Sequence, residues 1–415
     1  MEHHTKLLIV GWGNDSTGFG RVLSVIGESL QSVFDIHCLA LDGNTPQTRL
    51  PWTHHPLQDP QDGYGKRQFR DMMQKLKPET VLLHFDFWLY HLYRDTLKDW
   101  PQTRVLMYYP TDGALFRAEP MAPLQELDLI IPYTEFGRDE LGGKFGELGL
   151  TEFPPMPVIG HGVDTDLFFP LNVEEGFGVN ALKNRRRIAR DAYFKGKADL
   201  EEAFIVLNAS ANRPRKELST SIRGFELFAR DKPRNVKLYI HADIERTVFD
   251  GKTIQALRSL WQSERLLLTS ELRPDHQRLS NAELNLLYNA CDLGLNTASA
   301  EGWGLIPTEH GAAGAAQLLP RHTNLPEIWG DAAIWMEPSR TSVSESMNIR
   351  RFHLDEYTVA EALENVYQSP STLAEYSEKA YQKTHETTFD WRQIGEKWRK
   401  LLQPDLQSAP QKLAR

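Results

Sequence analysis

Short apolar segments alternate with amphipathic, helix-like segments along most of this chain, and no other feature restricts the fold as strongly. The apolar segments form two series, one on each side of a polar stretch. Because parallel neighbouring strands need a crossover connection, usually a helix, this alternation predicts parallel sheets with helices on both faces. The expected strands are Lys6–Val10, Ile36–Leu41, Thr80–His84, Arg104–Tyr109, Leu129–Pro132 and Pro154–Ile159, followed by Ala203–Asn208, Lys237–His241, Leu266–Thr269, Asp292–Asn296 and Gln317–Leu319.

The polar stretch Leu171–Glu202 is the expected junction between two α/β domains, for which 415 residues are sufficient. We place the first domain at residues 1–185 and the second at residues 186–388. The run Arg185–Arg187 lies at this junction. It indicates a solvated helix face, with contact to a phosphate or an acidic surface as the alternative.

The end of the chain predicts one more helix, over residues 389–402, with Asp390 as its cap. Trp391, Ile394, Trp398 and Leu401 would share one face of this helix. Residues 403–415 contain two prolines and few apolar groups, so we expect a loose tail.

Composition narrows the functional classes. The net charge of −9 argues against a broad nucleic-acid footprint. Cys38 and Cys291 are the only cysteines, and both stand in apolar segments, which favours a reducing compartment over a disulfide or a cysteine-based zinc site. No apolar run approaches the roughly 18 residues that a membrane span needs, and no signal-peptide pattern begins the chain. We expect a cytoplasmic protein.

The segment from Glu301 to Glu309 carries the clearest functional signal. Its glycines allow backbone N–H groups to approach a ligand closely, and Pro307 suits the first turn of a helix whose positive end would face that ligand. An anion site flanked by two carboxylates suits a nucleotide sugar, whose hydroxyls need acceptors and whose diphosphate needs donors. The alternative is that Glu309 complements the dipole of its own helix and Glu301 is a solvated loop acid.

The preceding residues place this segment within the fold. Ser280 and Glu283 form a capping box for an amphipathic helix over 281–291, and the short strand Asp292–Asn296 follows. The Glu301 loop is therefore expected at the carboxyl end of a strand, where open parallel sheets bind ligands.

The pattern Glu-x7-Glu, with Gly-Trp-Gly-Leu after the first Glu, resembles the signature of the family-four retaining glycosyltransferases of the GT-B fold. The phrases Leu-Tyr-Asn-Ala-Cys-Asp-Leu before it and Asn-Leu-Pro-Glu-Ile-Trp-Gly-Asp-Ala-Ala after it resemble the same family. The resemblance implies two Rossmann-like domains that face each other across a cleft, with the donor held mainly by the second and the acceptor by the first. It also implies that the final helix crosses back onto the first domain. Glu327 matches a late family glutamate, although a helix-dipole role is sufficient to explain it.

A glycine loop follows the first strand. Gly11 and Gly13 lack the third glycine at position 16 that a nicotinamide-binding fingerprint needs. Gly18 and Gly20, in Gly-Phe-Gly-Arg, instead resemble the family's N-terminal glycine loop, which lies near the donor phosphates. A tight turn without a ligand is the alternative.

Basic residues for the diphosphate are expected after the first strand of the second domain. Lys216 matches the family lysine, and Arg213 is a displaced substitute for the family arginine, while Arg215 is expected to face solvent. His161 resembles the family's interdomain link and is interpreted as hinge architecture rather than as a base.

The first domain departs from the family where a His-Asp pair usually ends a strand. Only Asp112 remains there, because the corresponding stretch is Tyr-Tyr-Pro-Thr-Asp-Gly. His84 and Asp86 end another strand. They could shape the acceptor pocket or form a satisfied polar pair among aromatic residues, and we slightly favour the second interpretation.

The resemblance implies transfer of a hexosyl unit from a UDP- or GDP-linked sugar to a hydroxyl acceptor, with retention of the anomeric configuration. Glu301 would hold sugar hydroxyls and Glu309 the ribose hydroxyls, while Lys216 and Arg213 would oppose the diphosphate charge. Neither a metal nor a separate cofactor is required, and the acceptor class stays open. The alternatives are a GT-B epimerase or phosphorylase, or a non-catalytic nucleotide-sugar-binding protein. The candidate site residues are Glu301, Lys216, Arg213 and Asp112 for catalysis, and Gly18, Gly20, Gly302, Trp303, Gly304, Leu305 and Glu309 for the donor.

Overall fold

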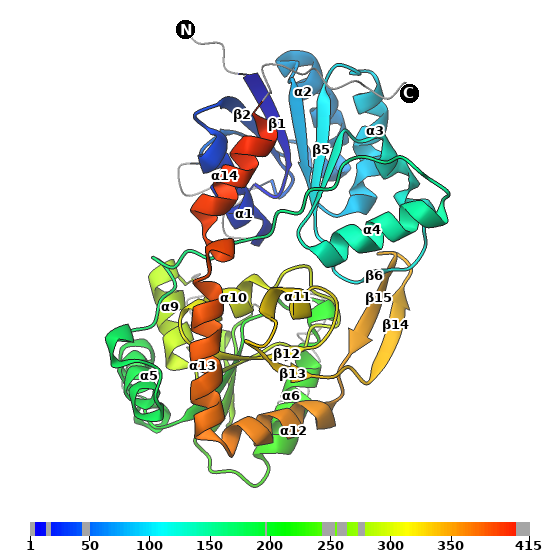
Figure 1. Ribbon diagram of the computed structural model, residues 1–415. Helices are drawn as coiled ribbons and strands as arrows, with labels where there is room; N and C mark the ends of the chain where they lie inside the picture. Colours follow the sequence, from blue (N-terminus) through cyan, green and yellow to red (C-terminus); the bar gives the residue numbers. More distant parts are fainter. Residues whose placement is uncertain are drawn as a thin grey trace.

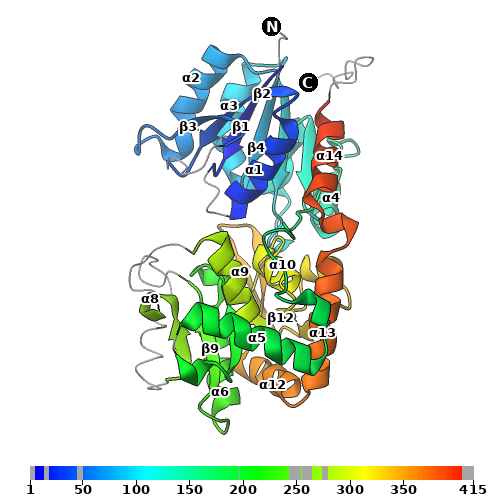
Figure 2. The same cartoon turned by 90° about the vertical axis from the view of Figure 1, so that its left-hand side faces the viewer.

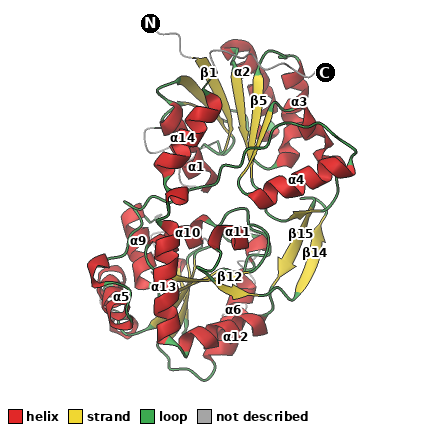
Figure 3. Ribbon diagram, in the orientation of Figure 1, coloured by secondary structure: helices red, strands yellow, loops and turns green. Residues whose placement is uncertain are grey.

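The computed structural model describes residues 5–13, 18–43, 50–195, 197–242, 254, 264–272 and 279–403. Two parallel sheets of six strands each form two domains, one above the other in Figure 1. Helices cover both faces of each sheet (Figure 3). The predicted α/β fold with two parallel sheets is therefore confirmed.

The first sheet has the strand order β3-β2-β1-β4-β5-β7. Leu7 to Val10 of β1 are fully buried and alternate between two core clusters, as expected for a parallel strand covered on both faces. Its strands are β1 Thr5–Gly11, β2 Phe34–Ala40, β3 Thr53–Pro56, β4 Thr80–His84, β5 Arg104–Tyr109 and β7 Leu129–Pro132; its helices are α1 Gly18–Leu30, α2 Lys66–Leu76, α3 Tyr90–Lys98 and α4 Glu135–Glu147, with short helical turns at Gly63–Gly65, Phe87–Leu89 and Glu119–Glu126.

The second sheet repeats this arrangement, with the order β10-β9-β8-β11-β12-β13. Its strands are β8 Phe204–Asn208, β9 Val236–Ile240, β10 Leu266–Leu268, β11 Leu293–Leu295, β12 Ala316–Pro320 and β13 Ile334–Met336. Its helices are α5 Val179–Phe194, α6 Leu218–Ala229, α8 Thr269–Leu272, α9 Asn281–Ala290, α10 Leu305–Ala312, α11 Leu325–Trp329, α12 Glu356–Tyr367 and α13 Pro370–Thr384, with short helical turns at Val173–Glu175, Ala198–Leu200, Pro214–Lys216 and Thr387–Phe389.

One predicted strand, Pro154–Ile159, is wrong. The segment forms only two isolated backbone hydrogen bonds with β7, from Ile130 N–H to the Pro155 carbonyl and from Ile159 N–H to the Pro132 carbonyl, each 3.1 Å long. Three of its residues are prolines, which have no N–H to donate to a ladder. The apolar pattern alone therefore overstated its strand character.

The arginine run was also misinterpreted as a solvated face. Arg185 and Arg186 are buried, and only Arg187 is exposed. Arg186 and Arg190 both pair with the buried Asp292 just before β11, and Arg190 also donates to the Ala290 carbonyl at 2.9 Å. Arg186 and Arg190 therefore hold α5 against the end of α9 and the start of β11.

The chain returns to the first domain through α14 Trp391–Leu402 (Figure 1). The expected cap is confirmed, since the Asp390 carboxylate accepts the Arg392 N–H at 2.8 Å. Trp398 is fully buried and meets Tyr108 of β5 edge-on, at 4.8 Å between ring centroids. Gly395 leaves room for Ser29 of α1, because a Cβ at position 395 would lie 2.2 Å from the Ser29 Oγ.

A third, small sheet joins the two domains. The antiparallel hairpin of β14 Arg340–Ser344 and β15 Ile349–His353 extends from the second domain and pairs with β6 Ala114–Leu115 of the first (Figure 1). The Asn348 side chain accepts the Arg117 N–H at 2.9 Å and donates to the Arg117 carbonyl at 2.8 Å. The hairpin thus connects the two domains by strand pairing and by hydrogen bonds between the Asn348 side chain and the Arg117 backbone.

Two further side chains cross between the domains. Asn324 donates to the carbonyls of Thr111 and Glu301, at 2.6 and 2.7 Å. Glu327 accepts the first N–H groups of α4, from Glu135 at 2.8 Å and Phe136 at 2.9 Å. Glu327 therefore has a helix-dipole role, but the helix it stabilises by hydrogen bonds belongs to the other domain.

Replacing Asn348 should weaken the hairpin's attachment. Asn348 has a φ of 52°, which glycine adopts without strain. Asn348→Gly removes two hydrogen bonds and should lower the free energy of unfolding by about 1–3 kcal/mol, while Asn348→Ala should cost roughly 1 kcal/mol more because of backbone strain. Urea unfolding of both variants checks this. A glycine variant as stable as the native chain would show that these bonds contribute nothing.

Candidate active site

The carboxyl ends of the two sheets face each other. Glu301 N–H, from the loop after β11, donates to the Asp112 carbonyl, from the loop after β5, at 2.8 Å. At the starts of α1 and α10, a Cβ on Gly18 would lie 3.1 Å from the Leu305 side chain. Figure 2 shows α1 above α9 and α10. Loops at ligand-binding ends of two parallel sheets therefore meet in one place.

The turn between the two candidate carboxylates depends on glycine. Gly304 precedes α10 with a φ of 90°, a conformation that side chains disfavour. Gly302 packs against the first domain, since a Cβ there would lie 2.7 Å from the Asp112 Oδ1 and 2.8 Å from the Pro110 Cβ. Pro307 lies in the first turn of α10, as predicted. The positive end of α10 consequently faces the first domain.

Glu301 is the centre of a buried charge cluster. Its carboxylate is hydrogen-bonded to the Lys216 ammonium and lies 3.4 Å from the Arg215 guanidinium. Burial alone would raise the pKa of Glu301, but Lys216 and then Arg215 lower it to about 2. Glu301 is therefore a fully ionised carboxylate, and the interpretation of Glu301 as a solvated loop acid is wrong.

Arg215, rather than Arg213, contributes the guanidinium of this cluster. The Arg215 Nε lies 3.3 Å from the Asp112 carboxylate of the first domain, and its Nη1 donates to the Ala300 carbonyl at 2.8 Å. Arg213 precedes the helical turn Pro214–Lys216 and is exposed. The expectation that Arg215 faces solvent is wrong, because the turn directs both of its last residues toward Glu301.

Glu309 forms a second charge cluster with residues that the sequence did not single out. Its carboxylate lies 2.6 Å from the Arg21 guanidinium of α1 and accepts the Tyr288 hydroxyl at 2.9 Å. Burial raises the pKa of Glu309, and Arg21 and Tyr288 partly offset this effect. Arg21 directly follows Gly20 of the glycine motif, and this position is the sequence feature that could have identified it as a site residue.

Trp303 contacts the interdomain link through its side chain. A Cβ on Gly160 would lie 2.5 Å from the indole, and the His161 ring is 5.1 Å away between centroids. His161 is buried and hydrogen-bonded to the Tyr108 hydroxyl at 2.8 Å, and burial lowers its pKa well below the usual range. These contacts agree with hinge architecture for His161. Because the Trp303 side chain packs against the link, only its backbone N–H is a candidate for contact with the sugar-donor substrate.

His84 and Asp86 occupy different environments. His84 is buried among aromatic rings and hydrogen-bonded to the Tyr133 hydroxyl at 2.9 Å, so its partner is not Asp86. Burial lowers the pKa of His84 to about 3. Asp86 follows β4 in the cleft, where burial and the charge of Asp112 raise its pKa to about 7, although Arg215 acts in the opposite direction.

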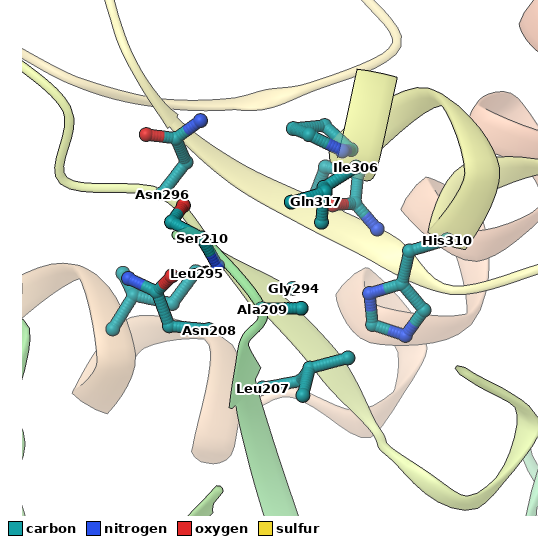
Figure 4. Close-up of a pocket in the computed structure, with 11 residues that line it drawn as sticks. Leu207, Asn208, Ala209, Ser210, Gly294, Leu295, Asn296, Ile306, His310 and Gln317 are labelled. Atoms are coloured by element: carbon teal, nitrogen blue, oxygen red, sulfur yellow. Dashed lines mark hydrogen bonds between the residues drawn. The ribbon is translucent and has the colours of Figure 1, made fainter. Parts of the chain in front are cut away.

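A small pocket lies behind the first turn of α10 (Figure 4). Asn208, Ser210 and Asn296 come from the carboxyl ends of β8 and β11, while Gln317 and His310 lie on the other side. The Asn296 amide also lies 3.5 Å from the Glu301 carboxylate. The pocket therefore adjoins the charge cluster through Asn296.

Within the described part of the chain, no group of three or more His, Cys, Asp or Glu side chains is arranged to hold a metal ion. In the same residues, no helix has both the length and the apolar character needed to cross a membrane.

Comparison with known proteins places the fold. No family model and no curated protein matches the sequence. Solved structures do match: sucrose-phosphate synthase from Thermosynechococcus elongatus has a TM-score of 0.69 at 15% identity, over 96% of this chain and 98% of that one. Anabaena Alr3699/HepE, in complex with UDP and glucose, has a TM-score of 0.69 at 14% identity, over 96% and 99%.

Another match is the catalytic domain of starch synthase IV from Arabidopsis thaliana, bound to ADP and acarbose. Its TM-score is 0.62 at 12% identity, over 96% of this chain and 99% of that one. These structures are GT-B glycosyltransferases. This chain has the GT-B fold. Its two sheets align with nearly the whole length of each of these structures.

The raised pKa of Asp86 predicts a pH-dependent effect of Asp86→Asn. A carboxyl whose pKa is raised on folding stabilises the fold below its unfolded pKa of about 4, and this contribution is lost as the pH rises through about 7. Asparagine does not ionise, so the stability of the variant relative to the native chain should increase between pH 4 and pH 8. Parallel urea titrations at both pH values measure this difference. A difference in stability that does not change with pH would show that folding leaves the pKa of Asp86 unshifted.

Proposed function

We propose that this protein is a retaining glycosyltransferase that moves a hexosyl unit from a nucleoside diphosphate sugar to a hydroxyl acceptor. The observation that carries the proposal is the arrangement at the start of α10, where Lys216, Glu301 and Glu309 surround a glycine turn at the meeting point of two parallel sheets. A helix end and a lysine suit a diphosphate, and two carboxylates suit sugar hydroxyls.

The fold neighbours support a nucleotide-sugar donor. Alr3699/HepE is described in complex with UDP and glucose, and starch synthase IV with ADP and acarbose. These two structures contain different nucleotide bases, so they do not indicate which base this protein would bind. We therefore propose a nucleoside diphosphate sugar, with UDP and ADP to be tested beside GDP.

The residues would divide the work as follows. Backbone N–H groups of Gly302 to Leu305 would donate to the diphosphate, and Lys216 would oppose the charge that develops as the sugar–phosphate bond breaks. Arg215 replaces Arg213 in this proposal, because its guanidinium lies next to Glu301. Glu301 would accept sugar hydroxyls and Glu309 ribose hydroxyls. Asp112 would orient Arg215 from the acceptor side.

Cysteine usage agrees with a cytoplasmic location, which we also propose. Cys38 and Cys291 are buried free thiols. Burial raises the pKa of each thiol, which keeps both protonated and unreactive. Neither cysteine needs an oxidising compartment to contribute to the core.

The proposal is tested by offering the purified protein UDP-, GDP- and ADP-linked hexoses with a panel of hydroxyl acceptors. Nucleotide should be released from only one of these donor sugars. NMR of the product should show that the transferred sugar keeps the anomeric configuration it had in the donor. Lys216→Gln should lower turnover by about a hundredfold or more, while Arg67→Gln, on the first-domain surface, should not. Inversion of the anomeric centre would contradict the mechanism. Nucleotide binding without turnover of any donor would favour a non-catalytic binding protein.

Transfer should persist after metal removal. Lys216 and the start of α10 are proposed to oppose the diphosphate charge, so no divalent ion is needed for that task. Activity is compared before and after stripping with EDTA, with magnesium and manganese added back separately. Complete loss that either metal restores would refute metal independence without excluding glycosyl transfer.

A further inference from the structure

Arg21 of the first domain contacts Glu309, the second-domain residue that is proposed to accept the ribose hydroxyls. It belongs to α1, yet its guanidinium lies 2.6 Å from the Glu309 carboxylate of α10. Glu309 is buried, whereas about a third of the Arg21 side chain is exposed to solvent (35%). One carboxylate oxygen faces Arg21 and the other accepts the Tyr288 hydroxyl. The orientation of Glu309 is thus set from both domains.

The contact belongs to a reciprocal set across the cleft. Arg21 of the first domain pairs with Glu309 of the second, while Arg215 of the second pairs with Asp112 of the first. With Lys216 and Glu301, the two clusters contain three cations and three carboxylates, so their formal charges cancel. An incoming diphosphate would therefore compete with carboxylates for cations already in place.

The local geometry brings Arg21 to the point where two helices begin. Gly18, the first residue of α1, packs on Leu305, the first residue of α10. Both helix N-termini carry partial positive charge, and Arg21 lies one turn into α1. Glu309 lies one turn into α10. The pair therefore flanks the place where an anion would meet both helix ends.

We propose that Arg21 is a positioning residue for the nucleotide: it holds Glu309 in the orientation that accepts ribose hydroxyls and couples donor binding on the second domain to the first domain. This inference rests on the proposed function. A carboxylate offers about four acceptor positions, and Arg21 and Tyr288 occupy one on each oxygen. In this proposal, the ribose hydroxyls would use the two remaining positions.

The experiment compares three variants with the native protein by calorimetry with UDP, GDP and ADP. Arg21→Gln should weaken binding of the preferred nucleotide by about tenfold, and Arg21→Lys should recover most of that loss. Asn348→Gly is the matched control, because it loosens a domain contact that involves neither Arg21 nor Glu309. Its nucleotide affinity should stay within about twofold of the native value.

Steady-state kinetics add a measurement that a purely structural role would not change. Loss of a positioning contact to the nucleotide should raise the donor KM of Arg21→Gln more than it lowers kcat. If Arg21→Gln does not fold, Tyr288→Phe removes the other contact to Glu309 and should itself weaken nucleotide binding several-fold. Unchanged affinity in that variant would overturn the inference.

The outcomes separate this inference from the proposed function. If the native protein binds a nucleotide and Arg21→Gln binds it equally well, or no worse than Asn348→Gly, Arg21 is only a contact between domains. If the native protein binds none of the three nucleotides, both the positioning role and the proposed function fail.

Discussion

The buried carboxylate of Glu301 is the interaction on which this cleft depends. An ionised group without solvent needs partners of opposite charge, and Lys216 and Arg215 supply them. Arg215 is in turn shared with Asp112 of the first domain, so the requirement of one carboxylate reaches across both sheets. Removing one partner of such a buried set costs roughly 3–5 kcal/mol, because it leaves another charge unpaired.

The domain contacts follow the same logic and have a functional consequence. Glu327 caps α4 from the opposite domain, and the β14–β15 hairpin adds a strand to β6. The contact of Arg215 with Asp112 fixes charges between the domains before a ligand arrives, and preorganised groups stabilise developing charge better than groups that must reorient. The architecture therefore suits transfer chemistry at a diphosphate, in which positioning and electrostatics do most of the work.

Local sequence signals predicted the fold and the glycine turn before α10, on which the candidate site is centred, whereas pairing between distant residues escaped them. The Ser280 capping box, the Asp390 cap and the glycine turn before α10 all depend on neighbours within a few residues. Arg215 was assigned to solvent because its partners Asp112 and Glu301 lie about a hundred residues away on either side. The arginine run failed for the same reason, since Asp292 is distant in sequence. The hairpin was not predicted, because Arg340–Ser344 is almost entirely polar and lacks the apolar residues that mark a strand.

The most direct test of the central claim is a crystal structure with the preferred nucleoside diphosphate bound. The account predicts that the diphosphate lies at the first turn of α10 within hydrogen-bond reach of Lys216, with ribose hydroxyls on Glu309 and Arg21 still in contact with that carboxylate. A nucleotide bound elsewhere, such as the turn after β1 without contact to α10, would contradict it.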